Sequence, residues 1–181
     1  MQEYEVTGVQ QSEDAAYFAL LADCDPTTFE SAVKEAKWKK AMDAEIESIE
    51  KNDTWELTDL PKGHKTIGVK WVYKTKLKDN GKVDKYKARL VAKGYKQKFG
   101  VDYLEVFAPV ARHDTIKLVI TLATQNSWPI FQLDVKSVFL HGNLEEQVYV
   151  DQPPGYINVG NEHKVYHLKK ALYGLKQAPR A

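Results

Sequence analysis

Cysteine occurs once in the 181 residues, at Cys24, so no disulfide can form within the chain and a thiolate-rich zinc site is excluded. No apolar run approaches the roughly 18 residues that a membrane-spanning helix needs. The acidic, polar first residues do not form a signal peptide. We therefore expect a protein without membrane spans that stays inside the cell, in the cytoplasm, where a single free thiol is tolerated.

Several catalytic signatures are also missing. The chain has no glycine-rich phosphate loop, no nucleophile elbow and no Asp-Asp dipeptide. His163 and His167 are four residues apart, which would suit a metal ion on a helix. Their segment is predicted to be a strand, where this spacing separates two side chains too far for one ion, and no third ligand is evident. Solvated or structural roles are expected for both histidines.

The charge of the chain is strongly segregated. Residues 62–98 contain thirteen Lys and Arg against two acids, a net charge of +11, so the rest of the chain carries −10 of the total +1. A basic block between acidic flanks is typical of a surface that binds a polyanion. A solvated face that keeps the protein soluble would give the same count, and charge alone does not separate the two.

A basic two-stranded ribbon is predicted for residues 67–93. Apolar and aromatic residues alternate with basic ones in 67–78, as in a half-buried strand, and 83–93 form the return strand. Asn80-Gly81 between them predicts a tight primed turn, because both residue types tolerate a positive φ. The ribbon carries Lys70, Lys74, Lys76, Lys78, Lys82, Lys85, Lys87, Arg89 and Lys93.

Two helices and several short strands are predicted around the ribbon. An amphipathic helix covers 27–52, and Thr27 and Glu30 at its start have capping-box spacing. A second helix covers 114–125, with Asp114 as its N-cap. Its expected inner face is Ile116, Val119, Ile120 and Ala123. Strands are expected at 55–57, 131–135, 147–150 and 164–168, and a new element is expected to begin at 171.

Asp134 is a carboxylate near the end of the apolar strand 131–135. Such a group is costly to bury unless it caps a turn, pairs or binds a metal, and turn capping is the simplest interpretation of a single Asp. Phe139 follows five residues later. A strand-terminal Asp that holds Mg²⁺, with an aromatic side chain beneath the incoming sugar, is what a nucleotide polymerase needs.

The pattern becomes specific over long segments. These are KYKARLVAKGYKQ (85–97), FAPVAR (107–112), QLDVKSVFLHGNLEEQVYVDQPPGY (132–156) and KKALYGLKQAPRA (169–181). Together with EIESIEKNDTWEL and GVKWVYKTKLK, they resemble the copia-type (pseudovirus) retrotransposon reverse transcriptases, from about Pro26 to the last residue. The resemblance implies an α+β fold with a fingers region over 27–112, a helix plus the basic hairpin. Residues 113–181 would be an incomplete palm and 1–26 a tail or linker.

The resemblance also implies roles for single residues. Asp134 matches the first metal-binding aspartate of the palm, and Phe139 matches the gate that favours dNTPs over rNTPs, although it could equally be a core Phe. Lys87 and Arg89 resemble residues that grip the triphosphate, and Lys85 could replace Lys87. Contacts with the template and incoming base are implied for Tyr173, Gly174 and Lys176, and contacts with the RNA template and DNA primer for Lys74, Lys76, Lys85, Lys93 and Lys176.

The implied cofactor is a pair of Mg²⁺ ions, which needs several bridging carboxylates. In the family these include a later Tyr-X-Asp-Asp sequence, which the chain lacks. We therefore expect a fragment of an RNA-directed DNA polymerase that does not polymerise alone. A non-catalytic nucleic-acid-binding remnant of a decayed element is the alternative, and an inert product is a third possibility.

Overall fold

The computed structural model describes residues 25–133, 140 and 142–181. Asp134, Phe139 and all residues between them lie outside the described residues. The described elements, in chain order, are α2 (Phe29–Ala32), α3 (Ala36–Lys51), β1 (Trp55–Thr58), β2 (Thr66–Ile67), β3 (Val69–Leu77), β4 (Val83–Ala92), the 3₁₀ turn η1 (Gly94–Lys96), α4 (His113–Gln125), β5 (Asn143–Val150) and β6 (Val165–Lys170). The protein is therefore a mixed α+β chain with more strand than helix elements in this part.

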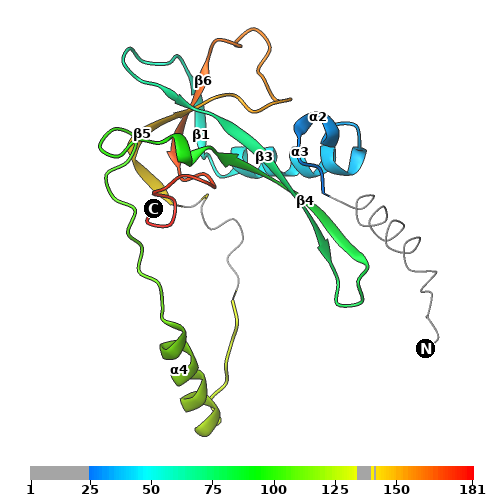
Figure 1. Cartoon of the computed structure of the whole chain (residues 1–181), viewed down its shortest axis with the longest axis vertical. Coiled ribbons are helices and arrows are strands. Elements are labelled where there is room, and N and C mark those ends of the chain that lie inside the picture. Colours follow the sequence, from blue (N-terminus) through cyan, green and yellow to red (C-terminus); the bar gives the residue numbers. More distant parts are fainter. Residues whose placement is uncertain (1–24, 134–139, 141) are drawn as a thin grey trace, which may run out of the picture.

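The strands form two sheets. β3 and β4 pair antiparallel as a two-stranded ribbon, and the other four strands form a sheet in the order β1-β6-β5-β2. Figure 1 shows the ribbon leaving the four-stranded sheet, passing α3 and ending in a tip that projects from the body. The ribbon and the strands expected at 55–57, 147–150 and 164–168 are confirmed, because β1 and β5 contain the first two strands and β6 overlaps the third from residue 165.

One part of the core lies between α3 and one face of the ribbon. Helix α3 buries Trp38, Met42, Ile46 and Ile49, which recur at helical spacing. The ribbon contributes alternate residues of each strand, as its period of two requires. These are Val69, Trp71 and Tyr73 on β3 and Ala88, Leu90 and Ala92 on β4, all buried. The Trp38 ring meets Tyr73 and Tyr86 edge-on, with centroids 5.4 and 5.0 Å away.

The turn of the ribbon differs from the expected primed two-residue turn. Gly81 has a φ of 75°, but Asn80 is not among the residues with positive φ. The Gly81 N–H donates to the Lys78 carbonyl at 2.9 Å, and the Lys78 N–H donates to the Lys82 carbonyl at 2.8 Å. This pattern is a three-residue loop that ends in a glycine bulge, which needs only one left-handed residue. The predicted turn type is therefore wrong, although the hairpin itself is correct.

The entry helix is broken where one continuous helix was expected. Helix α2 ends at Ala32, and α3 begins at Ala36 after the extended residue Glu35. The cap of α2 is Thr28, whose side chain accepts the Ser31 N–H at 3.2 Å. The predicted capping box of Thr27 and Glu30 is wrong, because the helix starts one residue later than the spacing indicated.

Helix α4 is present but its predicted packing is wrong. Its N-cap is Arg112, and Asp114 lies in the first turn. Of the four residues expected to face a core, only Ala123 is buried, whereas Ile116, Val119 and Ile120 are 42%, 58% and 47% exposed. Figure 1 shows α4 standing away from both sheets. Periodicity identified the apolar face, but no described element covers it.

The regions on either side of β5 and β6 are less regular than expected. Residues 131–133, the described part of the strand predicted at 131–135, form no regular structure. After β6 the chain runs through successive turns from 171 to 181, so the new element expected there is neither helix nor strand. This last segment is nevertheless well packed, with Leu172 and Leu175 buried in the core.

Candidate nucleic-acid interface

The outer face of the ribbon collects its cations. Directly opposed residues of an antiparallel pair share one face. The register sets Lys74 opposite Lys87, Lys76 opposite Lys85 and Val72 opposite Arg89. These residues alternate with the buried ones, so they lie on the face away from α3. We call this outer face the basic face; it consists of Lys70, Lys74, Lys76, Lys85, Lys87 and Arg89, with Val72 and Val91 among them.

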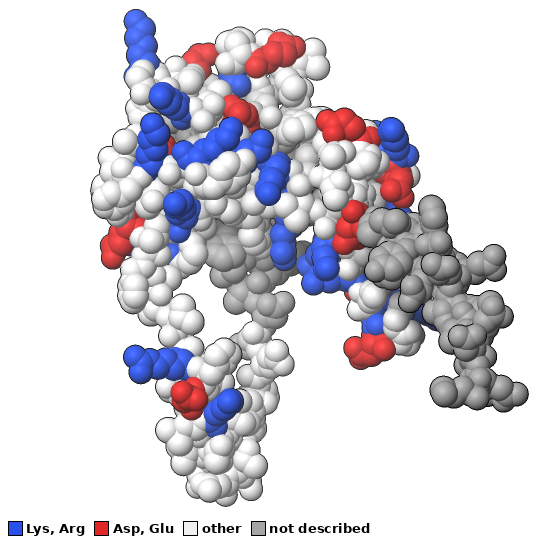
Figure 2. Space-filling view, in the orientation of Figure 1, with Lys and Arg blue, Asp and Glu red and all other residues white. Residues whose placement is uncertain are grey.

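Like charges stand opposite each other on the basic face. Two cross-strand pairs, Lys74–Lys87 and Lys76–Lys85, set lysines at directly opposed positions, an arrangement that destabilises an isolated hairpin. An anion with several charges removes this repulsion. Figure 2 shows Lys and Arg side chains gathered in a band over the ribbon and the body beside it. The face is therefore suited to a polyphosphate backbone.

Glu45 is an acidic residue at the edge of the ribbon that the sequence patterns did not single out. It projects from α3, and its Oε1 accepts the Leu90 N–H of β4 at 3.4 Å. Burial raises the pKa of Glu45, while the Leu90 hydrogen bond and the charges of Arg89 and Lys87 act in the opposite direction. Glu45 thus ties the edge of β4 to α3 and lies within the field of two basic-face cations.

The base of the ribbon meets the C-terminal segment. The Arg89 guanidinium lies 4.9 Å from the centroid of the Tyr173 ring, and the Ala92 N–H donates to the Tyr173 carbonyl at 2.7 Å. Gly174 follows with a φ of 89°, and a Cβ there would overlap the Ala92 carbonyl. The fold therefore brings Arg89, Tyr173 and Gly174 together, although they are far apart in the sequence.

A buried amide network holds this junction. Gln97 and Gln177 are 6% and 2% exposed, and the Gln97 Nε2 donates to the Gln177 Oε1 at 2.9 Å. The Gln97 Oε1 accepts the Lys176 N–H at 2.8 Å, and the Gln177 Nε2 donates to the Asp102 carbonyl at 3.0 Å. Gly94 also lets the two backbones come close together, because a Cβ at Gly94 would overlap the Gly174 carbonyl. No sequence pattern indicated this pair of glutamines.

The remaining predicted site residues lie near the junction or outside the described ranges. The Lys176 ammonium is 5.3 Å from the Tyr103 ring centroid. Lys93 directly follows β4, half-buried, and its N–H donates to the Gly68 carbonyl at 2.8 Å. Asp134 and Phe139 lie outside the described residues, so the structure does not relate them to Arg89.

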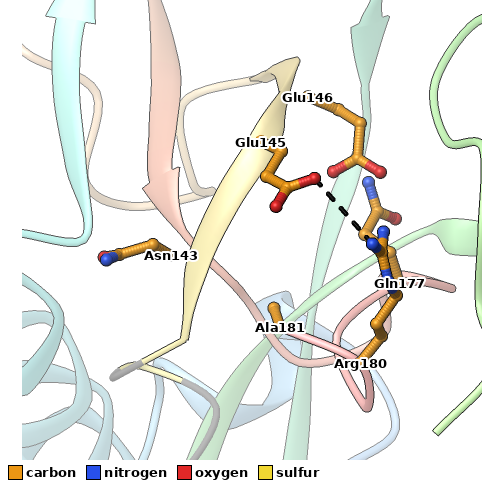
Figure 3. Close-up of a pocket in the computed structure, with 6 residues that line it drawn as sticks. All are labelled: Asn143, Glu145, Glu146, Gln177, Arg180 and Ala181. Carbon is orange, nitrogen blue, oxygen red and sulfur yellow. Dashed lines mark ion pairs between the residues drawn. The ribbon is translucent and has the colours of Figure 1, made fainter.

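A polar cavity opens beside this junction, with a volume of about 200 Å³. Its lining is Asn143, Glu145, Glu146, Gln177, Arg180 and Ala181. Arg180 lies 3.9 Å from Glu145, as Figure 3 shows, and 3.3 Å from Glu105 outside the cavity. The cation of the lining is thus already paired with acids, and no residue of the basic face reaches it.

A metal site is not formed by the described residues. Within 25–133, 140 and 142–181, no three His, Cys, Asp or Glu residues lie close enough to hold an ion together. Asp134, the expected ligand, lies outside these ranges. The same ranges contain no helix that is long and apolar enough to cross a membrane.

Comparisons with known proteins identify the family. The family model described as reverse transcriptase (RNA-dependent DNA polymerase) matches residues 52–181. The retrovirus-related Pol polyprotein from transposon RE1 of Arabidopsis thaliana is 47% identical over 164 residues, which are 90% of this chain and 11% of the polyprotein. The one from transposon TNT 1-94 of Nicotiana tabacum is 49% identical over 141 residues, 78% of this chain and 11% of the polyprotein.

The chain therefore spans about a ninth of the length of these polyproteins. An uncharacterized mitochondrial protein of Arabidopsis thaliana is 40% identical over 101 residues, 56% of this chain and 59% of that protein. No solved structure matches the chain. The 181 residues belong to the reverse transcriptase (RNA-dependent DNA polymerase) family, in the branch of the copia-type transposon Pol polyproteins.

Proposed function

We propose that the chain is the part of a retrotransposon reverse transcriptase that holds the phosphates of template, primer and incoming dNTP. The observation that supports this most is the basic face, where lysines of β3 stand opposite lysines of β4. A folded ribbon tolerates such pairs best when a polyanion lies across them. In this assignment residues 27–112 are the fingers and 113–181 the beginning of a palm.

The cations along the ribbon divide by position. Arg89 lies at the base of the ribbon, beside Tyr173 and Gly174. Its planar fork suits the oxygens of a triphosphate, and Lys87 lies two residues further along the same face as a second contact. Lys74, Lys76 and Lys85 lie closer to the tip and are assigned to the phosphate backbone of the template–primer. Lys85 is the alternative to Lys87 at the triphosphate.

Asp134 and Phe139 are proposed on the resemblance alone. Asp134 would supply one carboxylate ligand to Mg²⁺, which supplies charge neutralisation for phosphoryl transfer, and Phe139 would lie beneath the sugar of the dNTP. One carboxylate does not hold two ions about 4 Å apart, and the described residues add no cluster of ligands to it. What the described residues themselves do is bind and orient phosphates.

A salt titration tests the basic face. Binding of the 181-residue protein to a fluorescent primer–template duplex is followed by anisotropy at several salt concentrations. The triple variant Lys74→Ala/Lys76→Ala/Lys85→Ala is expected to lower the slope of log K against log salt by about 2–3, roughly 0.9 for each phosphate that is no longer neutralised. The matched control Lys34→Ala/Lys39→Ala/Lys51→Ala removes the same charge from exposed positions on and beside α3. An equal loss in both variants would show that net charge, and not the ribbon, determines binding.

A primer-extension assay tests the catalytic part of the proposal. The 181-residue protein is expected to incorporate no dTTP on an oligo(dT)–poly(rA) duplex with Mg²⁺, because it contains no Asp-Asp pair. Sustained incorporation that disappears in Asp134→Ala would contradict this. Magnesium-dependent dNTP binding that Asp134→Ala abolishes would support a polymerase site over a non-catalytic nucleic-acid-binding remnant.

A further inference from the structure

The segment that follows the ribbon exposes aromatic rings among lysines. Tyr95 is 71% exposed and Phe99 is 72% exposed, although both are large rings. Lys96 and Lys98 lie between the two rings in the chain and are also exposed. An exposed apolar side chain alone needs no explanation, but exposed rings on either side of two lysines combine a stacking surface with a phosphate contact.

The backbone beneath these rings is fixed by several hydrogen bonds. The Lys96 N–H donates to the Lys93 carbonyl at 2.8 Å, and the Gln97 N–H donates to the Gly94 carbonyl at 3.0 Å. The Gln97 side chain between the two rings is buried in the amide network with Gln177. Lys98 donates its N–H to the Asp102 carboxylate at 2.6 Å. A ligand that stacks here therefore orders little further backbone, which lowers the cost of binding.

A further aromatic ring and a further cation lie next to Phe99. Its ring meets Tyr103 edge-on with centroids 5.8 Å apart, and the Lys176 ammonium lies 5.3 Å from the Tyr103 ring centroid. The nearby acids are engaged, since Asp102 accepts the Lys98 N–H and Glu105 pairs with Arg180. The segment and its neighbours Tyr103 and Lys176 thus bring together three aromatic rings and three cations.

The exposed apolar residues on and just after α4 lack this combination. Leu118 and Val119 on α4 are 60% and 58% exposed, and Trp128 after the helix is 60% exposed. Lys117 is the only cation from residue 114 to 133, so that surface is apolar and not amphipathic. Two exposed rings with two lysines between them distinguish the segment 95–99 from the apolar surface on and after α4.

We propose that Tyr95 and Phe99 form a stacking platform for unpaired bases of single-stranded nucleic acid, whose phosphates Lys96 and Lys98 hold. The platform rests on the proposed function, because only Lys93 and Gly94 separate it from the end of β4 and the basic face. Four residues of chain reach at most about 14 Å, the length of about four stacked nucleotides at roughly 3.4 Å each. One short unpaired stretch can therefore contact both rings.

Stacking selects single strands over duplexes. Each unpaired base offers a flat π face to a ring, whatever its identity, whereas the faces of paired bases are covered by their neighbours in the helix. The platform is accordingly sequence-tolerant and serves a strand that continues beyond a duplex held by the ribbon. The sugar matters less than the base, so single-stranded DNA and RNA are both suitable ligands.

Paired variants in the 181-residue protein test the platform. Anisotropy with fluorescent oligo(dT), oligo(rU) and a blunt duplex of equal length compares Tyr95→Ala/Phe99→Ala with the parent. The double variant is expected to bind both single strands about tenfold or more weakly, with an unchanged salt slope, because stacking releases no counterions. Duplex binding should change less than twofold. Lys96→Ala/Lys98→Ala should instead lower the salt slope of single-strand binding.

Three controls make the result decisive. Tyr95→Phe/Phe99→Tyr keeps both rings and should bind as the parent does. Trp128→Ala removes a ring that is 60% exposed and lies outside the platform, and it should also bind as the parent does. Single-strand affinity that survives the loss of both rings, or falls equally for duplex and single strand, overturns the platform. Failure of the ribbon triple variant to change the salt slope of duplex binding overturns the proposed function instead. The two failures are therefore distinguishable.

Discussion

The guanidinium of Arg89 lies over the ring of Tyr173, with its central carbon 4.9 Å from the ring centroid. This contact joins the base of the ribbon to the C-terminal segment, two parts of the chain that only the fold brings together. A cation–π contact at an exposed site contributes about 0.5–1 kcal/mol and fixes the direction of the guanidinium fork. The fork is thereby oriented beside Gly174 for its proposed role at the triphosphate.

Tyr173→Leu is expected to weaken dTTP binding about two- to fivefold, because Leu removes the ring that orients Arg89. Tyr173→Phe retains the ring and should bind dTTP as the parent does. Calorimetric titration with dTTP measures both variants. In an Arg89→Ala background the Tyr173→Leu change should have no further effect on dTTP binding. An undiminished effect there would show that Tyr173 does not act through Arg89.

Gly174→Ala should destabilise the protein by at least about 2 kcal/mol more than Gly160→Ala. Both glycines have a positive φ, 89° and 83°, so both variants carry the backbone strain of a left-handed residue. Only at Gly174 would the new Cβ also meet the Ala92 carbonyl and the Val91 side chain, whereas Gly160 has open space. Urea denaturation gives the two free energies of unfolding. Equal losses of unfolding free energy in the two variants would mean that the backbone near Gly174 can shift away from β4 at no energetic cost.

Gln177→Leu is expected to cost about 1–3 kcal/mol of unfolding free energy, because it leaves the Gln97 Nε2 and the Asp102 carbonyl without the partners they now have. Gln97→Leu should cost a similar amount. The double variant should cost clearly less than the sum, since both residues belong to one network. Gln125→Leu, at an exposed position on α4, is the control with little expected effect. Strictly additive losses would show that the two amides act independently.

Glu45→Gln is expected to gain stability relative to the parent as pH rises. Burial raises the pKa of Glu45 in the folded protein above its ordinary value of 4.5. The folded state therefore holds this proton more tightly than the unfolded state, and this contribution to stability is lost as pH rises through the folded pKa. Gln keeps an oxygen that accepts the Leu90 N–H but carries no charge.

Unfolding free energies at about pH 4 and about pH 7 measure the effect of Glu45→Gln. The difference between variant and parent should be more favourable to the variant at the higher pH. Glu47→Gln changes an exposed residue on the same helix and is the control for the loss of one negative charge. The same pH dependence in both variants would contradict a special environment for Glu45.

Local patterns predicted the ribbon correctly and several details around it incorrectly. Alternation of period two fixes which side chains share a face, so the outward set including Lys74 and Lys87 was readable from the sequence. The Asn80-Gly81 turn was misassigned because these residues fit two loop types, and the register of the strands selects one. The capping box failed because Thr27 and Thr28 offer the same side chain at adjacent positions.

Whether an apolar helix face is covered or exposed could be decided only from the tertiary structure. The periodicity of α4 indicated its apolar stripe but not whether anything covers it, and Ile116 and Val119 are exposed. Glu45, Gln97 and Gln177 carried no sequence signal, because their importance comes from partners distant in the chain. The family resemblance, in contrast, was readable from the residues alone and is confirmed by the comparisons.

The sequence by itself determined the family, the strands of the ribbon and the gathering of its cations on one face, because these follow from local order and from the two-residue period of a strand. Only the tertiary structure decided that Tyr173 lies against Arg89, that Gly94 and Gly174 are in close approach, and that two buried glutamines hold this junction. Contacts between distant segments depend on how the whole chain packs, and packing is not encoded in any local pattern.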